Sequence, residues 1–280
     1  MSASPIHEGT VRLGGETYYE RRWPLAAPAG HILLVHGFGE HCGRYDHVAA
    51  AFNAAGYSVY SYDQRHHGRS PGTRARIDHF DRLPADLDAF EQHLRTLTGD
   101  APFFIFAHSM GGLVTARYLE IYGAPKGLRG VVFSSPFFQL PDNVSTLLIK
   151  VARFLSAVVP WLPVAKLEPE AISRDLAVVN AYVRDPLNNH SPICARTGSQ
   201  FNEAVMAARA EAARIAIPAY IFHGDSDRLA MHGGSEYLHA HIASTDKALT
   251  IYPGGYHELF NDRERDEVLR ATIAWYDARQ

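Results

Sequence analysis

The sequence contains few cysteines, and none of its hydrophobic runs is long enough to cross a membrane. Its two cysteines, Cys42 and Cys194, are too few for a disulfide framework and form no Cys-x-x-Cys pair. Low cysteine use suits a reducing compartment. Residues 1–15 are polar and mixed, and they lack the apolar core of a signal peptide. We therefore expect a protein of the cytoplasm.

The sequence also lacks an excess of basic charge. Its formal net charge is −3 and its isoelectric point is about 6.6, whereas a nucleic-acid-binding surface is normally basic. We therefore expect no nucleic-acid partner. Nothing in the sequence indicates an oligomeric state.

Patterns for metal and phosphate binding are missing as well. Two histidine-rich stretches, "RHHG" at 65–68 and "HAH" at 239–241, have no accompanying cysteines or carboxylates at metal-ligand spacing. No glycine-rich loop has a phosphate-binding pattern. We therefore expect no metal site and no cofactor.

Short apolar runs alternate with helical patterns along most of the chain. The runs that predict buried strands are residues 31–37, 57–63, 102–109, 128–136, 217–225 and 248–255. The patterns that predict helices are residues 44–55, 84–98, 111–122, 232–242 and 263–278. This alternation predicts an α/β fold with a mostly parallel central sheet flanked by helices. Residues 9–23 instead predict a hairpin around Gly14–Gly15, which would form an antiparallel edge.

The alternation stops between residues 137 and 216, where no clear strand pattern is present. This break predicts a core of residues 1–136 and 217–280, interrupted at 137–216 by a helical cap and its return to the core. Two apolar stripes at helical spacing lie in its first part: Leu148, Val151, Leu155, Val158 and Leu162, and Leu147, Phe154 and Trp161. A two-sided apolar helix is either an ordinary core helix or a lid over an apolar pocket. We favour the lid, because long insertions in compact domains tend to be functional.

The stretch "AHSMGG" (107–112) places Ser109 between an expected strand and an expected helix. In that context, the motif G-x-S-x-G forms a tight turn that exposes a nucleophilic serine above the sheet. The residues two before and two after the serine must be small, and here they are Ala107 and Gly111. Ala107 departs from the usual glycine and tolerates positive φ poorly. The alternative is a serine that only caps the helix.

A serine nucleophile needs a base, and the base needs an acid that orients it. In folds that carry this strand–turn–helix motif, the three residues follow one another along the chain in the order serine, acid, histidine. His257 follows the last expected strand, and this position distinguishes it from the other histidines of the chain, which has sixteen. Two acids, Asp225 and Asp227, follow the preceding strand. We favour Asp227, because an aspartate directly after a glycine commonly ties a turn.

An ester carbonyl attacked by serine develops negative charge, which two backbone N–H groups must stabilise. One is expected from Met110, the residue after the nucleophile, at a helix N-terminus whose dipole favours an anion. The other is expected from the loop after the first central strand, where "HGFGEH" places Phe38 between two glycines. The alternative for this loop is a simple turn at a strand end.

Taken together, the motifs resemble the monoacylglycerol lipase and lysophospholipase group of α/β-hydrolases. The resemblance extends from about residue 9 to 278 and includes "ISRD" (172–175) and "YVRDPL" (182–187), which look like that group's cap signature. The other motifs that carry it are "HGFGEHCGRYDHVA", "YDQRHHGRSPG", "AHSMGG", "HGDSDRL" and "YPGGYHELF".

The resemblance implies a catalytic triad of Ser109, Asp227 and His257, with Phe38 and Met110 as oxyanion donors. It also implies that Tyr182 touches the alcohol part of a bound ester, whereas its alternative role is packing within the cap. Two positions depart from the group. Ala107 and His66 each replace a glycine, and we expect His66 to alter packing rather than chemistry.

These observations predict a serine ester hydrolase that cleaves monoacylglycerol-like esters through an acyl-enzyme. The apolar cap is expected to hold the acyl chain and to make transient contact with a membrane or micelle. Related possibilities are a broad carboxylesterase or lysophospholipase and, within the same fold, a carbon–carbon bond hydrolase or an aminopeptidase using Glu168 and Glu170. A dehalogenase or epoxide hydrolase of this fold would need aspartate at the position of Ser109. A non-enzymatic binding protein would typically have lost a triad member, and all three positions are filled.

Overall fold

A computed structural model of the chain describes residues 6–140 and 146–280. Part of the predicted cap, residues 141–145, and the start of the chain lie outside the described residues. The side chains of Leu147 and Leu148, which belong to the two predicted apolar stripes, lie outside them too.

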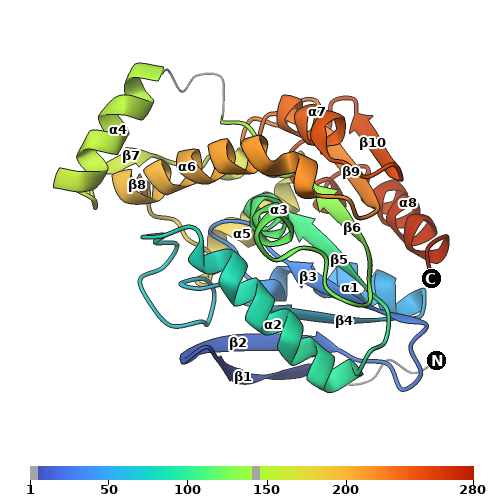
Figure 1. The fold of residues 1–280 in the computed structure, drawn as a ribbon. Coiled ribbons are helices and arrows are strands. Elements are labelled where there is room, and N and C mark those ends of the chain that lie inside the picture. Colours follow the sequence, from blue (N-terminus) through green and yellow to red (C-terminus); the bar gives the residue numbers. More distant parts are fainter. Residues whose placement is uncertain (1–5, 141–145) are drawn as a thin grey trace.

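In the described part of the chain, eight strands form one sheet in the order β1-β2-β4-β3-β5-β6-β9-β10 (Figure 1). The strands from β4 to β10 pair in parallel, while β1 and β2 are antiparallel to each other and β2 is antiparallel to β4. The strands are β1 (His7–Leu13), β2 (Glu16–Trp23), β3 (Gly30–Val35), β4 (Tyr57–Tyr62), β5 (Phe103–His108), β6 (Leu128–Ser134), β9 (Ala219–Gly224) and β10 (Lys247–Tyr252).

The central strands are apolar on both faces, because helices cover both sides of the sheet. Successive side chains of a strand point to opposite faces. In β3, Leu33 and Val35 join one buried cluster, while Ile32 and Leu34 join the other. This explains why the sequence shows continuous apolar runs rather than alternation.

Each face of the sheet has its own set of helices. Side chains of α2, α3, α6 and α7 complete one cluster, and those of α1 and α8 complete the other. These helices are α1 (Asp46–Ala54), α2 (Arg82–Thr98), α3 (Met110–Tyr122), α6 (Ala195–Glu211), α7 (His232–His241) and α8 (Arg265–Asp277). Short 3-10 turns lie at Cys42–Tyr45, Ala212–Arg214 and Leu259–Asn261.

The expected fold class is confirmed, and the expected strands and helices of the core are present with small shifts at their ends. The hairpin turns at Gly14 and Gly15, whose φ angles of 56° and 87° are those that glycine adopts without strain. Helix α2 begins at Arg82 rather than 84. Pro84 therefore lies in the first turn, where a helix tolerates proline.

Between β6 and β9, residues 137–216 contain more than the helices that the sequence predicts. The described elements are α4 (Thr146–Val158), β7 (Pro163–Ala165), a 3-10 turn at Pro169–Ala171, α5 (Leu176–Arg184), β8 (Ile193–Cys194) and α6. Strands β7 and β8 form a small antiparallel sheet that the sequence did not indicate. Helix α6 packs along α3 and contributes Phe201, Val205 and Ala208 to the core cluster, whereas α4 lies at the periphery beside α6 (Figure 1).

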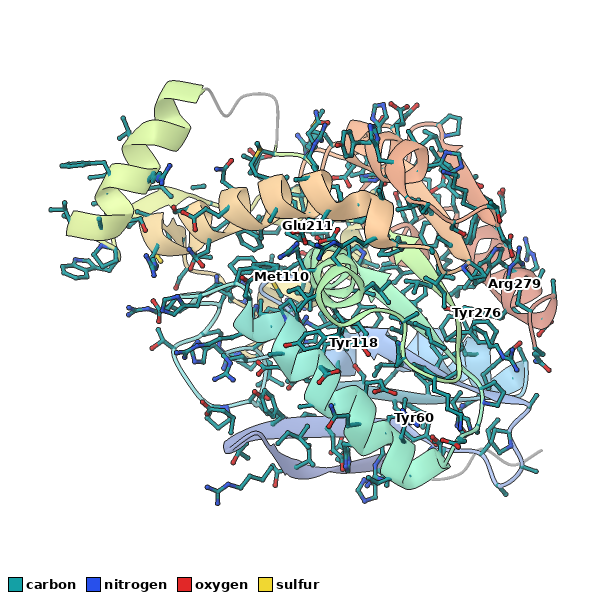
Figure 2. The ribbon with its side chains drawn as sticks, in the orientation of Figure 1. Tyr60, Met110, Tyr118, Glu211, Tyr276 and Arg279 are labelled. Carbon is teal, nitrogen blue, oxygen red and sulfur yellow. The ribbon has the colours of Figure 1, made fainter. Side chains whose placement is uncertain are left out.

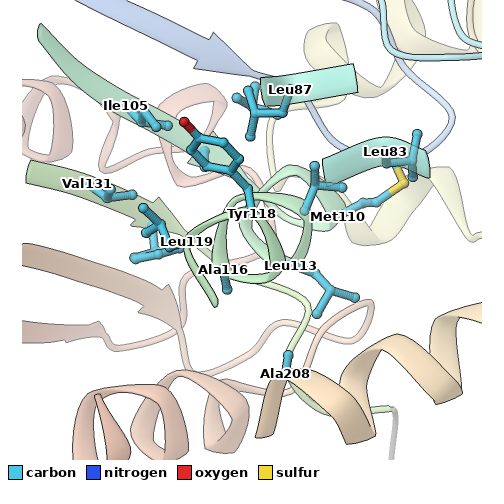
Figure 3. Packing of buried hydrophobic residues seen from close by; sticks show 14 of the residues in the cluster. Leu83, Leu87, Ile105, Met110, Leu113, Ala116, Tyr118, Leu119, Val131 and Ala208 are labelled. Carbon is cyan, nitrogen blue, oxygen red and sulfur yellow. The ribbon is translucent and has the colours of Figure 1, made fainter. Parts of the chain in front are cut away.

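Helix α3 is the most enclosed helix described, and every residue from Met110 to Glu120 is buried. Figure 3 shows it ringed by Leu83 and Leu87 of α2, Ile105 of β5, Val131 of β6 and Ala208 of α6. Its first turn lies against the end of β3. A Cβ atom on Gly111 would overlap the carbonyl oxygens of Val35 and His36.

We predict that Gly111→Ala destabilises the fold by about 1–3 kcal/mol, because an added methyl group must displace backbone atoms. Gly198→Ala is the matched control in α6, where the new methyl would meet its nearest neighbour at an ordinary 3.5 Å. That change should stabilise the helix by up to about 1 kcal/mol. Urea unfolding of both variants measures the difference, and equal stability would contradict the tight approach at Gly111.

Candidate active site

The predicted site residues follow four strands at the same edge of the sheet, and β6 lies between the second and the third of them. Phe38 follows β3, Ser109 follows β5, Asp227 follows β9 and His257 follows β10. Because the carboxyl ends of parallel strands meet at one edge, residues far apart in sequence come together there.

Ser109 occupies a strained turn between β5 and α3. Its φ of 53° and ψ of −118° place it in a region that non-glycine residues rarely adopt, at a cost of roughly 1–3 kcal/mol. The turn is held by backbone hydrogen bonds. Ser109 N donates to Ser134 O (2.9 Å), and Ser109 O accepts from Gly112 N (2.9 Å) and Phe137 N (3.0 Å).

The structure explains why alanine is acceptable at position 107. Ala107 lies within β5, paired with Val35 and Phe133, and it is fully buried. Its φ is not positive, because the left-handed conformation falls on Ser109 instead. The position therefore needs a small side chain rather than the backbone freedom of glycine.

Asp227 and His257 form a short, buried hydrogen bond. His257 Nδ1 lies 2.6 Å from Asp227 Oδ2, and both residues are at most 5% exposed. Backbone N–H groups of Leu229 (2.8 Å) and Ala230 (3.0 Å) donate to Asp227 Oδ1 and fix the carboxylate. The rival acid, Asp225, is exposed and accepts from Gly254 N, in the loop after β10, at 2.6 Å. It therefore joins two loops rather than tying its own turn as expected.

A second histidine, His223, contacts the same carboxylate, and the sequence reasoning missed it. Its Nε2 lies 2.9 Å from Asp227 Oδ2 and 3.0 Å from Ala230 O. Both atoms are acceptors, so Nε2 carries the proton. Nδ1 lies 2.7 Å from Ser235 Oγ, which therefore donates to it. The only available signal was that His223 stands four residues before Asp227 at the end of β9.

The charges of this pair stabilise each other. Burial alone would raise the pKa of Asp227, but the charge of His257 and hydrogen bonds from His223 and His257 hold it well below its usual range. Burial alone would lower the pKa of His257, but the charge and hydrogen bond of Asp227, assisted by Glu258 and Glu40, raise it above its usual range. Burial and the charge of His257 lower the pKa of neighbouring His108 to about 3, so that ring is neutral.

The loop after β3 lies beside Ser109. A Cβ atom on Gly37 would stand 3.2 Å from Ser109 Cβ, so glycine permits this close approach. Met110 begins α3 in the interior of the molecule (Figure 2). Within the described chain, the backbone N–H groups of Phe38 and Met110 donate to no other residue. Both therefore have an unused donor, one in the residue after Ser109 and one in the loop beside it.

These residues line a cavity that is partly open to solvent. Ser109, Met110, Phe38 and His257 belong to its wall, and Asp227 lies behind His257. Most of the remaining wall is apolar: Phe137, Leu167, Pro169, Ile172, Ile193, Phe201 and Leu229. Tyr182 of α5 lines the cavity too and is 5% exposed.

The cavity also has a charged, buried wall that the sequence reasoning missed. The Arg44 guanidinium bonds both oxygens of Glu258 (2.7 and 2.8 Å) and one oxygen of Glu40 (2.6 Å). The other Glu40 oxygen accepts from Gly37 N (2.6 Å) and Tyr45 Oη (2.7 Å). Arg44 also lies over the Tyr182 ring, 4.8 Å from its centroid. The cluster joins the loop after β3 to the loop that carries His257.

The lid role expected for helix α4 stays a prediction, because the side chains of residues 146–150 and 152 lie outside the described residues. Among the described side chains, the cavity wall includes none from α4. Instead Phe154, Val158 and, just after the helix, Trp161 are 58–69% exposed. Within residues 6–140 and 146–280, no helix combines the length and apolar character needed to cross a membrane.

His66, the second departure from the group's glycines, adopts a φ of 64°, where glycine would be unstrained. Its Nδ1 lies 2.8 Å from Arg76 O, and its ring fills the space that a Cβ on Gly72 would occupy. His66 is not among the residues of the cavity wall. Both contacts lie in the loop between β4 and α2, and the expectation that His66 alters packing rather than chemistry stays a prediction.

Comparisons with known proteins identify the family. A family described as serine aminopeptidase, S33, matches residues 26–264. The chain is 38% identical to a monoacylglycerol lipase of Mycolicibacterium smegmatis over 98% of both chains. It is 31% identical to the monoglyceride lipase of Rattus norvegicus, covering 94% of this chain and 86% of that one.

A solved structure shows the same relationship in three dimensions. The crystal structure of Paleococcus ferrophilus monoacylglycerol lipase superposes with a TM-score of 0.83 at 31% identity, covering 94% of this chain and 99% of that one. The resemblance seen in the sequence motifs is thereby confirmed. The chain belongs to the monoacylglycerol lipase family of α/β-hydrolases and is an ester hydrolase.

Proposed function

We propose that this enzyme hydrolyses monoacylglycerols to a fatty acid and glycerol through an acyl-enzyme on Ser109. The observation that carries the proposal is the 2.6 Å Asp227–His257 hydrogen bond, placed at a cavity that the strained Ser109 also lines. The names of the matched relatives, monoacylglycerol lipase and monoglyceride lipase, support this substrate class.

The reaction begins with attack of Ser109 Oγ on the ester carbonyl. His257 Nδ1 donates to Asp227, which leaves Nε2 as the ring nitrogen that accepts the serine proton. His257 then gives this proton to the departing glycerol oxygen as the ester C–O bond breaks. Water attacks the acyl-enzyme by the same route, which releases the fatty acid and restores Ser109. Asp227 stabilises the imidazolium in both halves.

The unused N–H groups of Phe38 and Met110 hold the oxyanion in this proposal. Donors fixed before the reaction are worth more in a water-poor site than in bulk water. Met110 adds the favourable end of the α3 dipole. Glu40 contributes indirectly, because it holds Gly37 N and so fixes the backbone next to Phe38.

Different parts of the cavity wall contact the acyl chain and the glycerol part of the substrate. The apolar side chains accommodate the acyl chain, with about 0.8 kcal/mol for each buried methylene. Tyr182 lies against the charged wall of Glu40, Arg44 and Glu258 and is placed to contact the glycerol part.

Other substrates of the same fold are less well supported. A broader carboxylesterase or lysophospholipase would use the same residues, and only substrate preference separates it. An aminopeptidase needs a free carboxylate for the substrate ammonium. The acids of the cavity wall are instead paired, Glu40 and Glu258 with Arg44 and Glu168 with Arg228 (3.6 Å).

We further propose that residues 137–216 act as a cap whose outer surface touches a membrane or micelle. The exposed apolar side chains of α4 and Trp161 support this contact, because monomeric soluble proteins rarely expose large apolar patches. Lipid substrates would enter from that surface. A cytoplasmic location remains part of the proposal and rests on the low cysteine content.

We predict that Ser109→Ala lowers kcat on 1-monoacylglycerols and p-nitrophenyl esters by about 10⁶-fold, as removal of a serine nucleophile does elsewhere. Ser226→Ala is a control at an exposed serine near the same edge. The wild type should prefer monoacylglycerols over aryl esters of equal chain length. A wild type inert on all esters, or an active Ser109→Ala, would refute the proposed function, and activity on amino-acid p-nitroanilides would favour an aminopeptidase.

The raised pKa of His257 predicts a pH dependence. The base must be neutral to accept the serine proton, so kcat/KM should fall as pH decreases through the His257 pKa, with a midpoint above about 6.5. Asp227→Asn should lower kcat by about 10⁴-fold. It should also move this midpoint to lower pH, because burial then acts on the ring without the opposing charge.

Asp225→Asn serves as the matched control for this prediction, since Asp225 is exposed and tied to Gly254 rather than to His257. Its rate and pH profile should equal those of the wild type. If the two variants exchanged behaviour, Asp225 would be the acid. pH–rate profiles of a soluble ester measure both effects.

We predict that replacing both Phe154 and Trp161 by serine weakens binding to phosphatidylcholine vesicles and lowers the rate on vesicle-borne monoacylglycerol by about tenfold. The rate on a soluble short-chain ester should not change, since neither residue lines the cavity. Tyr122→Ser, at an exposed aromatic on the C-terminal end of α3, is the control. Unchanged vesicle binding in the double variant would show that this surface does not contact lipid.

A further inference from the structure

Two short segments of residues 137–216 contact the two loops that carry the proposed chemistry. They are residues 172–175, "ISRD", and residues 182–189, "YVRDPLNN". We propose that these segments are positioning elements that fix His257 and the oxyanion loop, so that the cap is part of the catalytic machinery as well as a substrate enclosure. The inference rests on the proposed function, because it concerns the same serine hydrolase site.

The first segment fixes the loop of His257 through one buried carboxylate, Asp262. The Asp262 side chain is fully buried. Its Oδ1 accepts from Arg174 N (3.0 Å) and lies 3.4 Å from Ser173 Oγ. Its Oδ2 accepts from Arg174 Nε (2.9 Å) and from Tyr256 N (3.2 Å). The carboxylate thus joins the cap to the residue immediately before His257.

Further contacts fix this loop on the other side of His257. Glu258 N donates to Ile172 O at 2.8 Å, and Ser173 Oγ donates to Asn261 O at 2.9 Å. Arg174 also pairs with Glu264, just beyond the loop. The backbone on both sides of His257 is therefore held by three consecutive cap residues.

The second segment fixes the loop after β3. Asp185 Oδ2 lies 2.9 Å from His41 Nε2, and Asn189 N donates to Gly39 O at 2.8 Å. Asp185 itself is held in place by Leu187 N, which donates to Oδ1 at 2.8 Å. Gly39 and His41 flank Glu40, which orients Gly37 N beside Phe38. The second segment of the cap therefore holds the oxyanion loop in place next to Phe38, whose backbone N–H group is the proposed donor.

This arrangement has a consequence that an acyl-chain enclosure alone would not have. Catalytic groups must keep their geometry to within a fraction of an ångström, and a displacement of about 1 Å costs about 10²-fold in rate. Loosening either segment should therefore lower kcat for every substrate, including esters too short to reach the apolar wall. Loss of enclosure alone would raise KM for long-chain esters only.

The test compares Arg174→Ala with Arg196→Ala, the same substitution at another arginine in the 137–216 region. Arg196 Nε donates to Asp78 O (2.8 Å), so it joins α6 to the core without touching either catalytic loop. We measure kcat and KM for p-nitrophenyl acetate and p-nitrophenyl octanoate, well below the melting temperature of the least stable variant. Asp262→Asn is the second variant, because it keeps the shape but replaces one of the two acceptor oxygens by an NH2 group and removes the charge that pairs with Arg174.

The expected result is a ten- to hundredfold loss of kcat on both esters for Arg174→Ala and Asp262→Asn, with KM changed less than about twofold. Arg174→Lys should recover part of the rate, and Arg196→Ala should match the wild type. An unchanged kcat on the acetate in both variants, or an equal loss in Arg196→Ala, would overturn the inference. Failure of the proposed function would appear separately, as an inert wild type or an active Ser109→Ala.

Discussion

The left-handed backbone of Ser109 is the constraint on which the site depends. A non-glycine residue holds a φ of 53° only where surrounding structure makes every other conformation worse. Here β5 and α3 are both buried, and Gly111 lets the first turn of α3 touch the end of β3. The core therefore does more than stabilise the chain, because its packing places Ser109 in the wall of the cavity.

Buried charge is the second organising feature, and it is paired throughout the site. Asp227 is compensated by two histidines and two backbone N–H groups, and Arg44 by two glutamates. Removing one partner from such a cluster is costly, since it leaves an uncompensated charge away from water. This cost ties together loops that come from β3, β9 and β10. Rigidity of the site follows from electrostatics as well as from apolar packing.

The helices between β6 and β9 differ in what they contact. Helix α6 belongs to the core, α5 and the segments around it contact the loops that carry Phe38 and His257, and α4 presents apolar side chains outward. The sequence pattern correctly marked α4 as two-sided and apolar. It did not show that the cavity wall comes from other segments, such as Ile172, Ile193 and Phe201. Periodicity reveals that a face is apolar but contains no information about which surface meets it.

The sequence by itself determined the sheet, its helices and the positions of Ser109, Asp227 and His257 at strand ends, because local periodicity and chain order are enough for a parallel α/β fold. Tertiary structure alone decided how those residues meet. It placed Asp227 rather than Asp225 against His257, and it brought Arg44 to Glu258 across 214 residues. It also put His223 against Asp227 and joined Arg174 to Asp262. Such contacts depend on the three-dimensional proximity of distant loops, which spacing along the chain does not encode.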